Sequence, residues 1–243
     1  MGNPRPKYHK HFTRFRVIDL ETTGNPIGSE VVEIGAGDLF RGDLIPVGSD
    51  SVRPGSEIFE LGAAVHHITN DDVAHCRRLD ELLPHYFDYD GTVGIDVFAA
   101  HNARFEKGFL GDAMPDDRTI CTYKCAVRLF PKAPAHSNQV LRYWLQPKGL
   151  SSLLANMTHR ALPDAYVTAA ILRELLELAT VEELVSWTQQ PVLLPRVCFG
   201  KYKGLGWTEL PLDYLEWIVE KSDLNEDVKF TATHYRANGR TVA

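Results

Sequence analysis

The chain has 243 residues, of which 44% are hydrophobic and 24% are charged, as is ordinary for a globular protein. No apolar run approaches the ~20 residues that cross a bilayer, which excludes a membrane-spanning helix, and the N-terminus has no apolar segment typical of a secretory signal. We therefore expect a cytoplasmic protein without a membrane partner. The formal net charge of −6 excludes binding to nucleic acid mainly through a basic surface, but a carboxylate-rich metal site would lower the net charge in the same way.

The N-terminal residues 1–12 are rich in Lys and Arg and contain no acid. We interpret them as a basic arm that is solvated, with contact to a phosphate backbone as the alternative. The first predicted element is a strand over residues 14–20, which alternates and then becomes apolar, as core strands do.

Two carboxylates, Asp19 and Glu21, stand two positions apart at the end of this strand. Side chains at i and i+2 of a strand point to the same face, so we expect the two acids to lie side by side. Like charges at that separation raise each other's pKa unless a positive group lies between them. The pair therefore needs a partner from elsewhere in the chain.

Two further strands follow at hairpin distance, over residues 30–40 and 49–54, and predict an antiparallel meander. Residues 55–76 are expected to be loop and short helix, with Thr69 or Asn70 as an N-cap. Beyond them the pattern predicts a helix at 79–87, a strand at 92–102, a helix at 103–114, a strand and then a helix over 117–131, and helices at 137–145, 149–157, 162–179 and 181–190. This order predicts an α/β fold with a mixed sheet.

The C-terminal part of the chain is expected to form a linker and a small separate unit. Residues 181–195 are expected to be a linker helix and loop, with Thr180 and Glu183 as a capping box. Residues 196–243 predict a small unit with a strand at 196–199, a Gly/Lys loop and two short helices, packed on the first domain because it is small for an independent core.

The chain contains four cysteines. Cys121 and Cys125 lie one helical turn apart, but no second Cys or His pair at zinc spacing accompanies them. We interpret all four as free thiols without a zinc site or a disulfide framework.

More acids occur at strand ends and helix starts. Glu106 lies one turn inside a helix that follows a strand, His159 lies in a loop, and Asp164 lies in the first turn of the long helix. Open α/β sheets collect site residues at such places. Several carboxylates meeting without compensation would cost several kcal/mol each, whereas two hard cations such as Mg²⁺ or Mn²⁺ between them would make the cluster favourable. A metal pair of this kind activates a water against a phosphodiester, and His159 is suited to act as the general base.

Three segments, DLETTG (19–24), AHNARFE (100–106) and HRALPDA (159–165), resemble the motifs of the DEDDh group of DnaQ-like 3′→5′ exonucleases in the RNase H-like superfamily. The resemblance covers residues 13–180. It implies an RNase H-like exonuclease domain that uses two Mg²⁺ or Mn²⁺ ions and releases 5′-mononucleotides from the 3′ end of a nucleic acid.

Carried over to this chain, the resemblance implies that Asp19 bridges both metals, Glu21 binds one, and Asp164 completes the metal shell. It also implies that His159 deprotonates the attacking water. The family has Asp where this chain has Glu106, and the extra methylene displaces the carboxylate by about one bond length, while catalytic groups are held to roughly 0.5 Å. We expect activity to be kept, with loss of the second metal or a preference for Mn²⁺ as alternatives.

The resemblance also implies substrate contacts. Thr22 and Thr23 would offer backbone groups to the terminal nucleotide, and His66, in a segment similar to one of the family, would contact the substrate. Asn102 and Phe105 would line the groove beside the motif acid.

Residues 199–219 are similar to the tail of the exodeoxyribonuclease members of the family, which makes DNA the expected substrate and RNA the alternative. The tail places Lys201, Tyr202 and Lys203 together, with Trp207 nearby, as in surfaces that track a nucleic-acid strand. A glycine turn with solvated lysines fits the same residues equally well. Tyr214, Trp217 and Cys198 are interpreted as core.

Other functions stay open at this point. A degenerate exonuclease that only binds nucleic acid would keep binding without cleavage, and a hydrolase of small phosphodiesters would prefer dinucleotides to long strands. The oligomeric state is open, a homodimer included.

Overall fold

The computed structural model describes residues 9, 12–24, 28–87 and 94–238. The expected basic arm lies outside the described residues except for His9 and Phe12. None of the helices in the described part of the chain combines the length and apolarity that a bilayer crossing needs.

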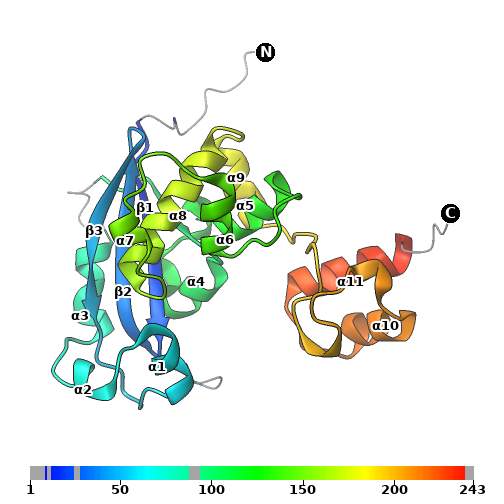
Figure 1. The fold of residues 1–243 in the computed structure, drawn as a ribbon, viewed down its shortest axis with the longest axis horizontal. Helices are drawn as coiled ribbons and strands as arrows, with labels where there is room; N and C mark the ends of the chain where they lie inside the picture. The colour runs from blue at the N-terminus through cyan, green and yellow to red at the C-terminus, as the bar shows by residue number, and fades with distance from the viewer. Residues whose placement is uncertain (1–8, 10–11, 25–27, 88–93, 239–243) are drawn as a thin grey trace.

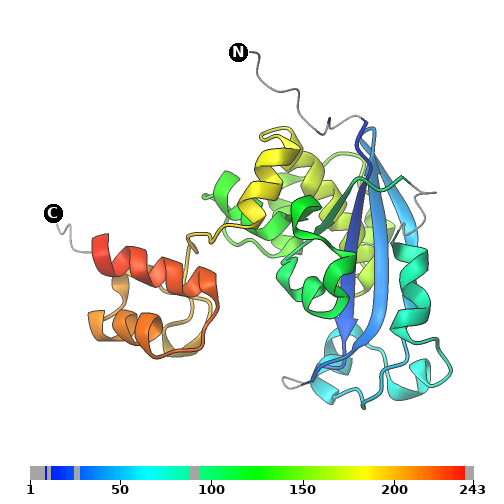
Figure 2. The ribbon, with the colours of Figure 1, turned by 180° about the vertical axis from the view of Figure 1, so that it is seen from behind.

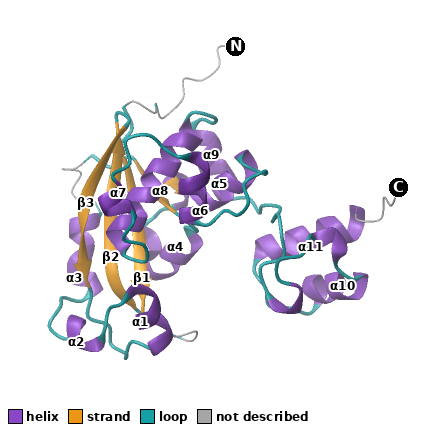
Figure 3. Ribbon diagram, viewed as in Figure 1, coloured by secondary structure: helices purple, strands orange, loops and turns teal. Residues whose placement is uncertain are grey.

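The described residues form one five-stranded sheet in the order β3-β2-β1-β4-β5. The strands are β1 Phe15–Thr22, β2 Val31–Phe40, β3 Asp43–Ser51, β4 Val97–Ala100 and β5 Thr119–Cys121. β1, β2 and β3 form the expected antiparallel meander, and β4 and β5 add in parallel on the other side of β1. The mixed α/β sheet predicted from the sequence is therefore confirmed (Figure 3).

Helices surround this sheet and form the C-terminal part of the chain. They are α1 Glu60–His66, α2 Asn70–Val73, α3 Leu79–Tyr86, α4 Arg104–Leu110, α5 Thr122–Leu129, α6 Asn138–Leu145, α7 Ser152–Ala155, α8 Ala161–Leu176, α9 Val181–Thr188, α10 Leu212–Glu220 and α11 Glu226–Asn238. Two predicted caps are confirmed, because Thr69 precedes α2 in a capping box with Asp72, and Thr180 precedes α9 in one with Glu183.

Each face of the sheet has its own core. Phe15 and Val17 of β1 pack on the face that α8 covers, together with α5, α6 and α9 (Figure 1). Ile18 and Leu20 pack on the opposite face, against α3 and α4 (Figure 2). Because side chains alternate along a strand, residues 19 and 21 continue the row of Phe15 and Val17 and lie on the face of α8. The fold thus directs both motif acids of β1 toward the longest helix of the domain.

β3 begins earlier than predicted. The hairpin between β2 and β3 turns at Arg41 and Gly42, which both have positive φ, as a tight two-residue hairpin turn requires. This turn allows β3 to start at Asp43, although Pro46 and Gly48 within it are poor strand formers.

The C-terminal unit differs from its prediction in three places. The expected strand at 196–199 does not form, and the backbone hydrogen bonds of Val197 to Leu205 and Gly204 close a loop instead. Cys198 is exposed, and Trp217, 42% exposed, lies outside the core. Leu215 and Ile218 occupy the inner face of α10 instead, and Trp207 fills the core against α11 at 2% exposure.

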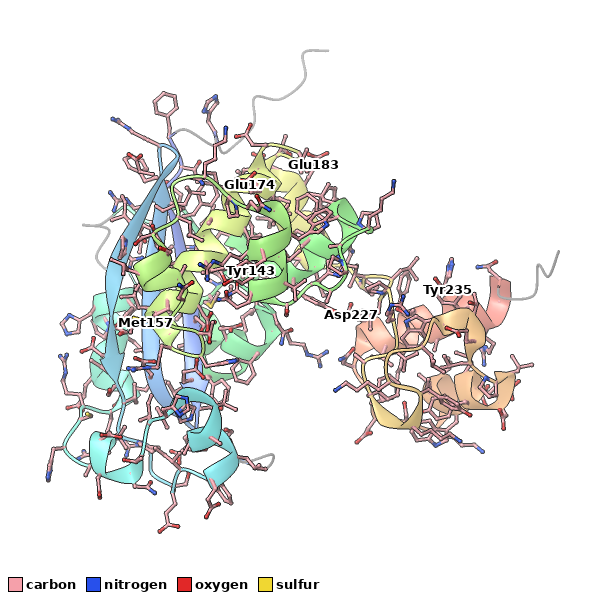
Figure 4. The ribbon with its side chains drawn as sticks, in the orientation of Figure 1. Tyr143, Met157, Glu174, Glu183, Asp227 and Tyr235 are labelled. Carbon is pink, nitrogen blue, oxygen red and sulfur yellow. The ribbon has the colours of Figure 1, made fainter. Side chains whose placement is uncertain are left out.

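The C-terminal unit contacts the first domain through α5. Val127 belongs to the hydrophobic core of the unit, and Lys124 forms an ion pair with Asp227 at 3.4 Å between Nζ and Oδ1. Asp227 lies at the edge of the unit that faces the first domain (Figure 4). Its carboxylate also accepts the N–H of Val192 in the connecting segment, at 2.9 Å.

Candidate active site

Three carboxylates meet where β1 ends and α8 begins. Asp19, Glu21 and Asp164 each offer an oxygen atom, and these atoms all lie within 4.8 Å of one another. The two acids of β1 lie there because they share a face of the strand, and Asp164 because the first turn of α8 crosses that face. The expectation that Asp19 and Glu21 are neighbours is therefore confirmed.

The carboxyls of the cluster are difficult to ionise without a cation. Burial raises the pKa of Asp19 well above its ordinary value, and repulsion from Glu106, Asp164 and Glu21 raises it further. Burial also raises the pKa of Glu21 to about 8, with added repulsion from Asp164. A cation that prefers oxygen ligands stabilises the ionised form of such neighbouring buried carboxyls. This donor set fits Mg²⁺ or Mn²⁺ and not a thiolate-binding metal.

Asp164 is held in place by bonds to both of its oxygens. The backbone N–H of His159 donates to Oδ2 at 2.7 Å, and Gln139 Nε2 donates to Oδ1 at 3.2 Å. Burial raises the pKa of Asp164, and these two hydrogen bonds oppose that rise. The orientation of this carboxylate toward β1 is thus fixed by the protein.

His159 precedes α8 in a left-handed conformation, with φ of 58°. Its side chain is exposed, while its backbone is fixed by the bond to Asp164. A strained non-glycine backbone of this kind is found at functional sites. The imidazole is therefore accessible beside the carboxylate cluster.

Glu106 approaches the cluster from α4. Its side chain is only 2% exposed, and Oε2 has no hydrogen-bond partner among the described residues. Burial raises the pKa of Glu106 to about 8. After burial, repulsion from this residue is the largest cause of the raised pKa of Asp19. A buried carboxylate oxygen without a partner among the described residues, close to Asp19, fits a site that binds a cation.

A fifth acid, Glu33, was not singled out from the sequence. It lies opposite Glu21 on β2, is 1% exposed, and accepts two hydrogen bonds from Arg160, at 2.7 and 3.0 Å. It also accepts the backbone N–H of Ala161 at 2.9 Å. This carboxylate therefore anchors the N-terminus of α8, which carries Asp164. The signal in the sequence was an acid inside a largely apolar strand.

His66 differs from its expected role. It is 2% exposed, and Nε2 lies 3.0 Å from the carbonyl oxygen of Thr22 while Nδ1 accepts the N–H of Ile68 at 3.1 Å. Burial lowers its pKa, which favours the neutral ring. Both ring nitrogens are used inside the protein, so His66 positions Thr22 and leaves no free nitrogen for a substrate.

Thr23 is fully buried, and its backbone is engaged as well. Its N–H donates to the carbonyl of Glu30 at 2.8 Å, and its carbonyl accepts the N–H of Phe59 at 3.0 Å. The backbone donor expected for a terminal nucleotide is thus used within the fold. Asn102 and Phe105, by contrast, are exposed at the start of α4, with Phe105 39% exposed.

Comparison with known proteins identifies relatives over most of the chain. A sequence model of the exonuclease family RNase_T matches residues 17–172. Exodeoxyribonuclease 10 of Escherichia coli (strain K12) is 33% identical, over 92% of this chain and 99% of that protein. DNA polymerase III subunit epsilon of Aquifex aeolicus is 30% identical, over 67% of this chain and 80% of its own length.

Solved structures agree with these matches. Exonuclease X in complex with 5′ overhanging duplex DNA is 34% identical, with a TM-score of 0.59 over 72% of this chain and 99% of that one. The nuclease domain of 3′hExo, a DEDDh family member bound to rAMP, is 18% identical, with a TM-score of 0.55 over 72% of this chain and 96% of that one, and shares the fold.

Proposed function

We propose, because this chain belongs to the RNase_T exonuclease family, that it removes nucleotides from the 3′ end of DNA and releases 5′-mononucleotides. The observation that carries the proposal is the meeting of Asp19, Glu21 and Asp164 within 4.8 Å at the end of β1. The similarity to Exodeoxyribonuclease 10 and to the DNA-bound Exonuclease X supports DNA as the substrate.

Asp19, Glu21 and Asp164 are the residues that would hold two divalent cations, Mg²⁺ or Mn²⁺, and Glu106 lies close to Asp19. When bound, such cations activate a water for attack on the phosphodiester and stabilise the leaving oxygen. The protein supplies the fixed orientation of this donor set, because both oxygens of Asp164 are held by hydrogen bonds.

His159 accepts the proton of the attacking water at a ring nitrogen. Its side chain is exposed beside the cluster, and its backbone is tied to Asp164. Positioned histidines of this kind contribute roughly 10²- to 10⁴-fold to rate. Asn102 and Phe105, exposed at the start of α4, line the groove for the terminal nucleotides.

Residues 13–180 form the catalytic domain in this proposal, residues 181–195 connect it to the C-terminal unit, and residues 196–243 are the small companion module. The contact between Lys124 and Asp227 supports a module that stays attached to the catalytic domain.

The test is a time course on 3′- and 5′-labelled single-stranded DNA and RNA of equal sequence, with Mg²⁺, Mn²⁺ or EDTA. We expect laddering from the 3′ end that needs a divalent metal and is faster on DNA. His159→Ala should slow it roughly 100-fold or more, whereas His75→Ala, which removes an exposed histidine far from the motifs in sequence, should not. Faster laddering of RNA would identify an exoribonuclease. Binding without cleavage under any metal would contradict the proposal, as would turnover confined to dinucleotides.

A further inference from the structure

A stack of aromatic rings lies on the C-terminal unit, with a lysine at one end. Tyr214 and Trp217 are stacked, with ring centroids 5.5 Å apart and planes 20° apart. Tyr202 meets Tyr214 edge to face at 4.7 Å. Lys201 places its Nζ 4.7 Å from the ring centre of Tyr202 and 5.7 Å from that of Tyr214. These four residues, 201, 202, 214 and 217, are called the aromatic stack below.

The local fold builds this arrangement. Tyr214 and Trp217 are three residues apart on α10, which places them on one side of the helix. Gly200 turns the chain with φ of 60°, and a Cβ there would lie 3.0 Å from the hydroxyl oxygen of Tyr214. The lysine loop therefore packs closely on the ring at the start of α10, because residue 200 has no side chain.

The outer end of the stack is open. Trp217 is 42% exposed although Leu215 and Ile218, its neighbours on α10, are buried. One side of its ring covers Tyr214, so the exposed area presents the indole to solvent. A large aromatic side chain that the core does not need is free to stack on a ligand.

A positive charge lies directly against the stack. The Nζ of Lys201 is 4.7 and 5.7 Å from the centres of two of its rings, and Lys203, one residue beyond Tyr202, is exposed as well. Of the acids of α10, Glu220 is paired with Arg236 at 2.9 Å, and Asp213 and Glu216 are exposed. Lys201 is therefore the group of the stack that can bind a phosphate.

We propose that the aromatic stack is a second binding site for single-stranded nucleic acid, with a base on Trp217 and a backbone phosphate on Lys201 and Lys203. Stacking on an aromatic ring tolerates any base, and a lysine beside it binds the phosphate without reading sequence. The proposal rests on the exonuclease function proposed above and goes beyond it. It gives the C-terminal unit the role of holding the polymer while the catalytic domain shortens it.

A second copy of the chain is the less suitable occupant. A stable protein interface buries about 800 Å² on each partner around an apolar centre. Here a single exposed indole is flanked by the exposed charges of Lys201 and Glu216, which an apolar centre would exclude.

Binding is measured with the full chain in EDTA, by the fluorescence anisotropy of a labelled 20-mer of single-stranded DNA. We expect Trp217→Ala to weaken binding about tenfold, Trp217→Phe to keep most of it, and Lys203→Glu to weaken it and reduce its salt dependence. Trp144→Ala is the matched control, because Trp144 is also 42% exposed but lies on α6 in the catalytic domain, and should bind like the parent.

A small substrate separates this inference from the proposed function. The p-nitrophenyl ester of thymidine 5′-monophosphate is too short to reach the aromatic stack, so Trp217→Ala should hydrolyse it at the parent rate with Mn²⁺. If the parent itself does not hydrolyse it or shorten any polymer, the proposed function fails. If the parent does, but Trp217→Ala binds and shortens the 20-mer like the parent, the aromatic stack is not a nucleic-acid site. A dimer in light scattering that Trp217→Ala converts to a monomer with unchanged binding would also overturn the proposal.

Discussion

Gly35 on β2 lies directly opposite Asp19 on β1, and the first turn of α8 rests on the place where a side chain of Gly35 would be. A Cβ there would clash with the backbone of Ala161 and Leu162. The missing side chain lets α8 approach the sheet closely enough for Asp164 to reach Asp19. Close approach of backbones is one of the uses of glycine.

Gly35→Ala should therefore damage the site more than the fold. The added methyl pushes the start of α8 away from β1, and a displacement of about 1 Å costs roughly 100-fold in rate. The measurement is kcat on single-stranded DNA together with the melting temperature. Gly37→Ala is the matched control on the same strand and face, because its Cβ would meet Tyr166 at an ordinary 3.5 Å. Equal loss in both variants would contradict the positioning role of Gly35.

Glu33→Gln should weaken metal binding, although Glu33 is not one of the proposed metal ligands. The neutral side chain loses its ion pair with Arg160, which anchors the turn that carries Asp164. Groups that orient metal ligands change affinity by roughly 10- to 100-fold. We expect a decrease of that size in Mn²⁺ affinity, measured from the paramagnetic resonance signal of free Mn²⁺.

Asp38→Asn provides the control for this prediction. Asp38 pairs with Arg16 across the same two strands, at the other end of the ladder from Glu33. Its loss should lower the melting temperature and leave the Mn²⁺ affinity of the folded protein unchanged. An equal decrease in affinity would show that Glu33 acts only through stability.

The motif residues were predictable from the sequence because their relationships are local. Asp19 and Glu21 needed only the alternation of a strand, and Asp164 only the first turn of a helix. Glu33 and Gly35 were not predictable, because their roles depend on the register between β1 and β2 and on where α8 crosses the sheet.

Burial within the C-terminal unit was equally hard to predict. The sequence placed Trp207 beside the lysines of a possible nucleic-acid surface and Trp217 in the core, but the structure has them the other way round, with Trp207 inside and Trp217 outside. Only the packing of α10 on α11 decides between the two. His66 shows the same limit near the site. Its motif suggested substrate contact, but Nε2 lies against the carbonyl oxygen of Thr22 at the end of β1, and Nδ1 accepts the N–H of Ile68.

The metal-free protein should lose stability as the pH rises. The pKa values of Glu21 and Glu106 increase from 4.5 to about 8 on folding, so the folded state binds more protons than the unfolded state between these values. The free energy of unfolding in EDTA should therefore fall from about pH 4.5 to pH 8 and then level. Thermal melts across this range measure the change in stability.

Divalent metal competes with these protons, so the increase in melting temperature with Mn²⁺ should grow over the same pH range. A stabilisation by metal that is equal at pH 5 and pH 8 would contradict this account.

Glu106→Gln should separate stability from activity. The amide keeps the shape of a side chain that is 2% exposed but removes a charge whose Oε2 has no partner among the described residues. The variant should melt at a higher temperature than the parent in EDTA at pH 8. In the parent, the carboxyl of Glu106 is ionised in the unfolded chain at this pH, so folding must either bury the charge or take up a proton, and the amide avoids both. With Mn²⁺ the order should reverse, since the variant offers the site one charge less.

Activity gives the second half of this prediction. Glu106→Gln should lose roughly 100-fold or more in kcat on DNA, as expected when a pre-organised charged group of a site is removed. Glu106→Asp, which restores the residue of the family motif, should keep activity within about tenfold, because the carboxylate remains on the same turn of α4 and faces Asp19. A ratio of Mn²⁺ to Mg²⁺ activity that falls in Glu106→Asp would show that the longer side chain sets the metal preference. An active Glu106→Gln variant would show instead that the three carboxylates of β1 and α8 are sufficient.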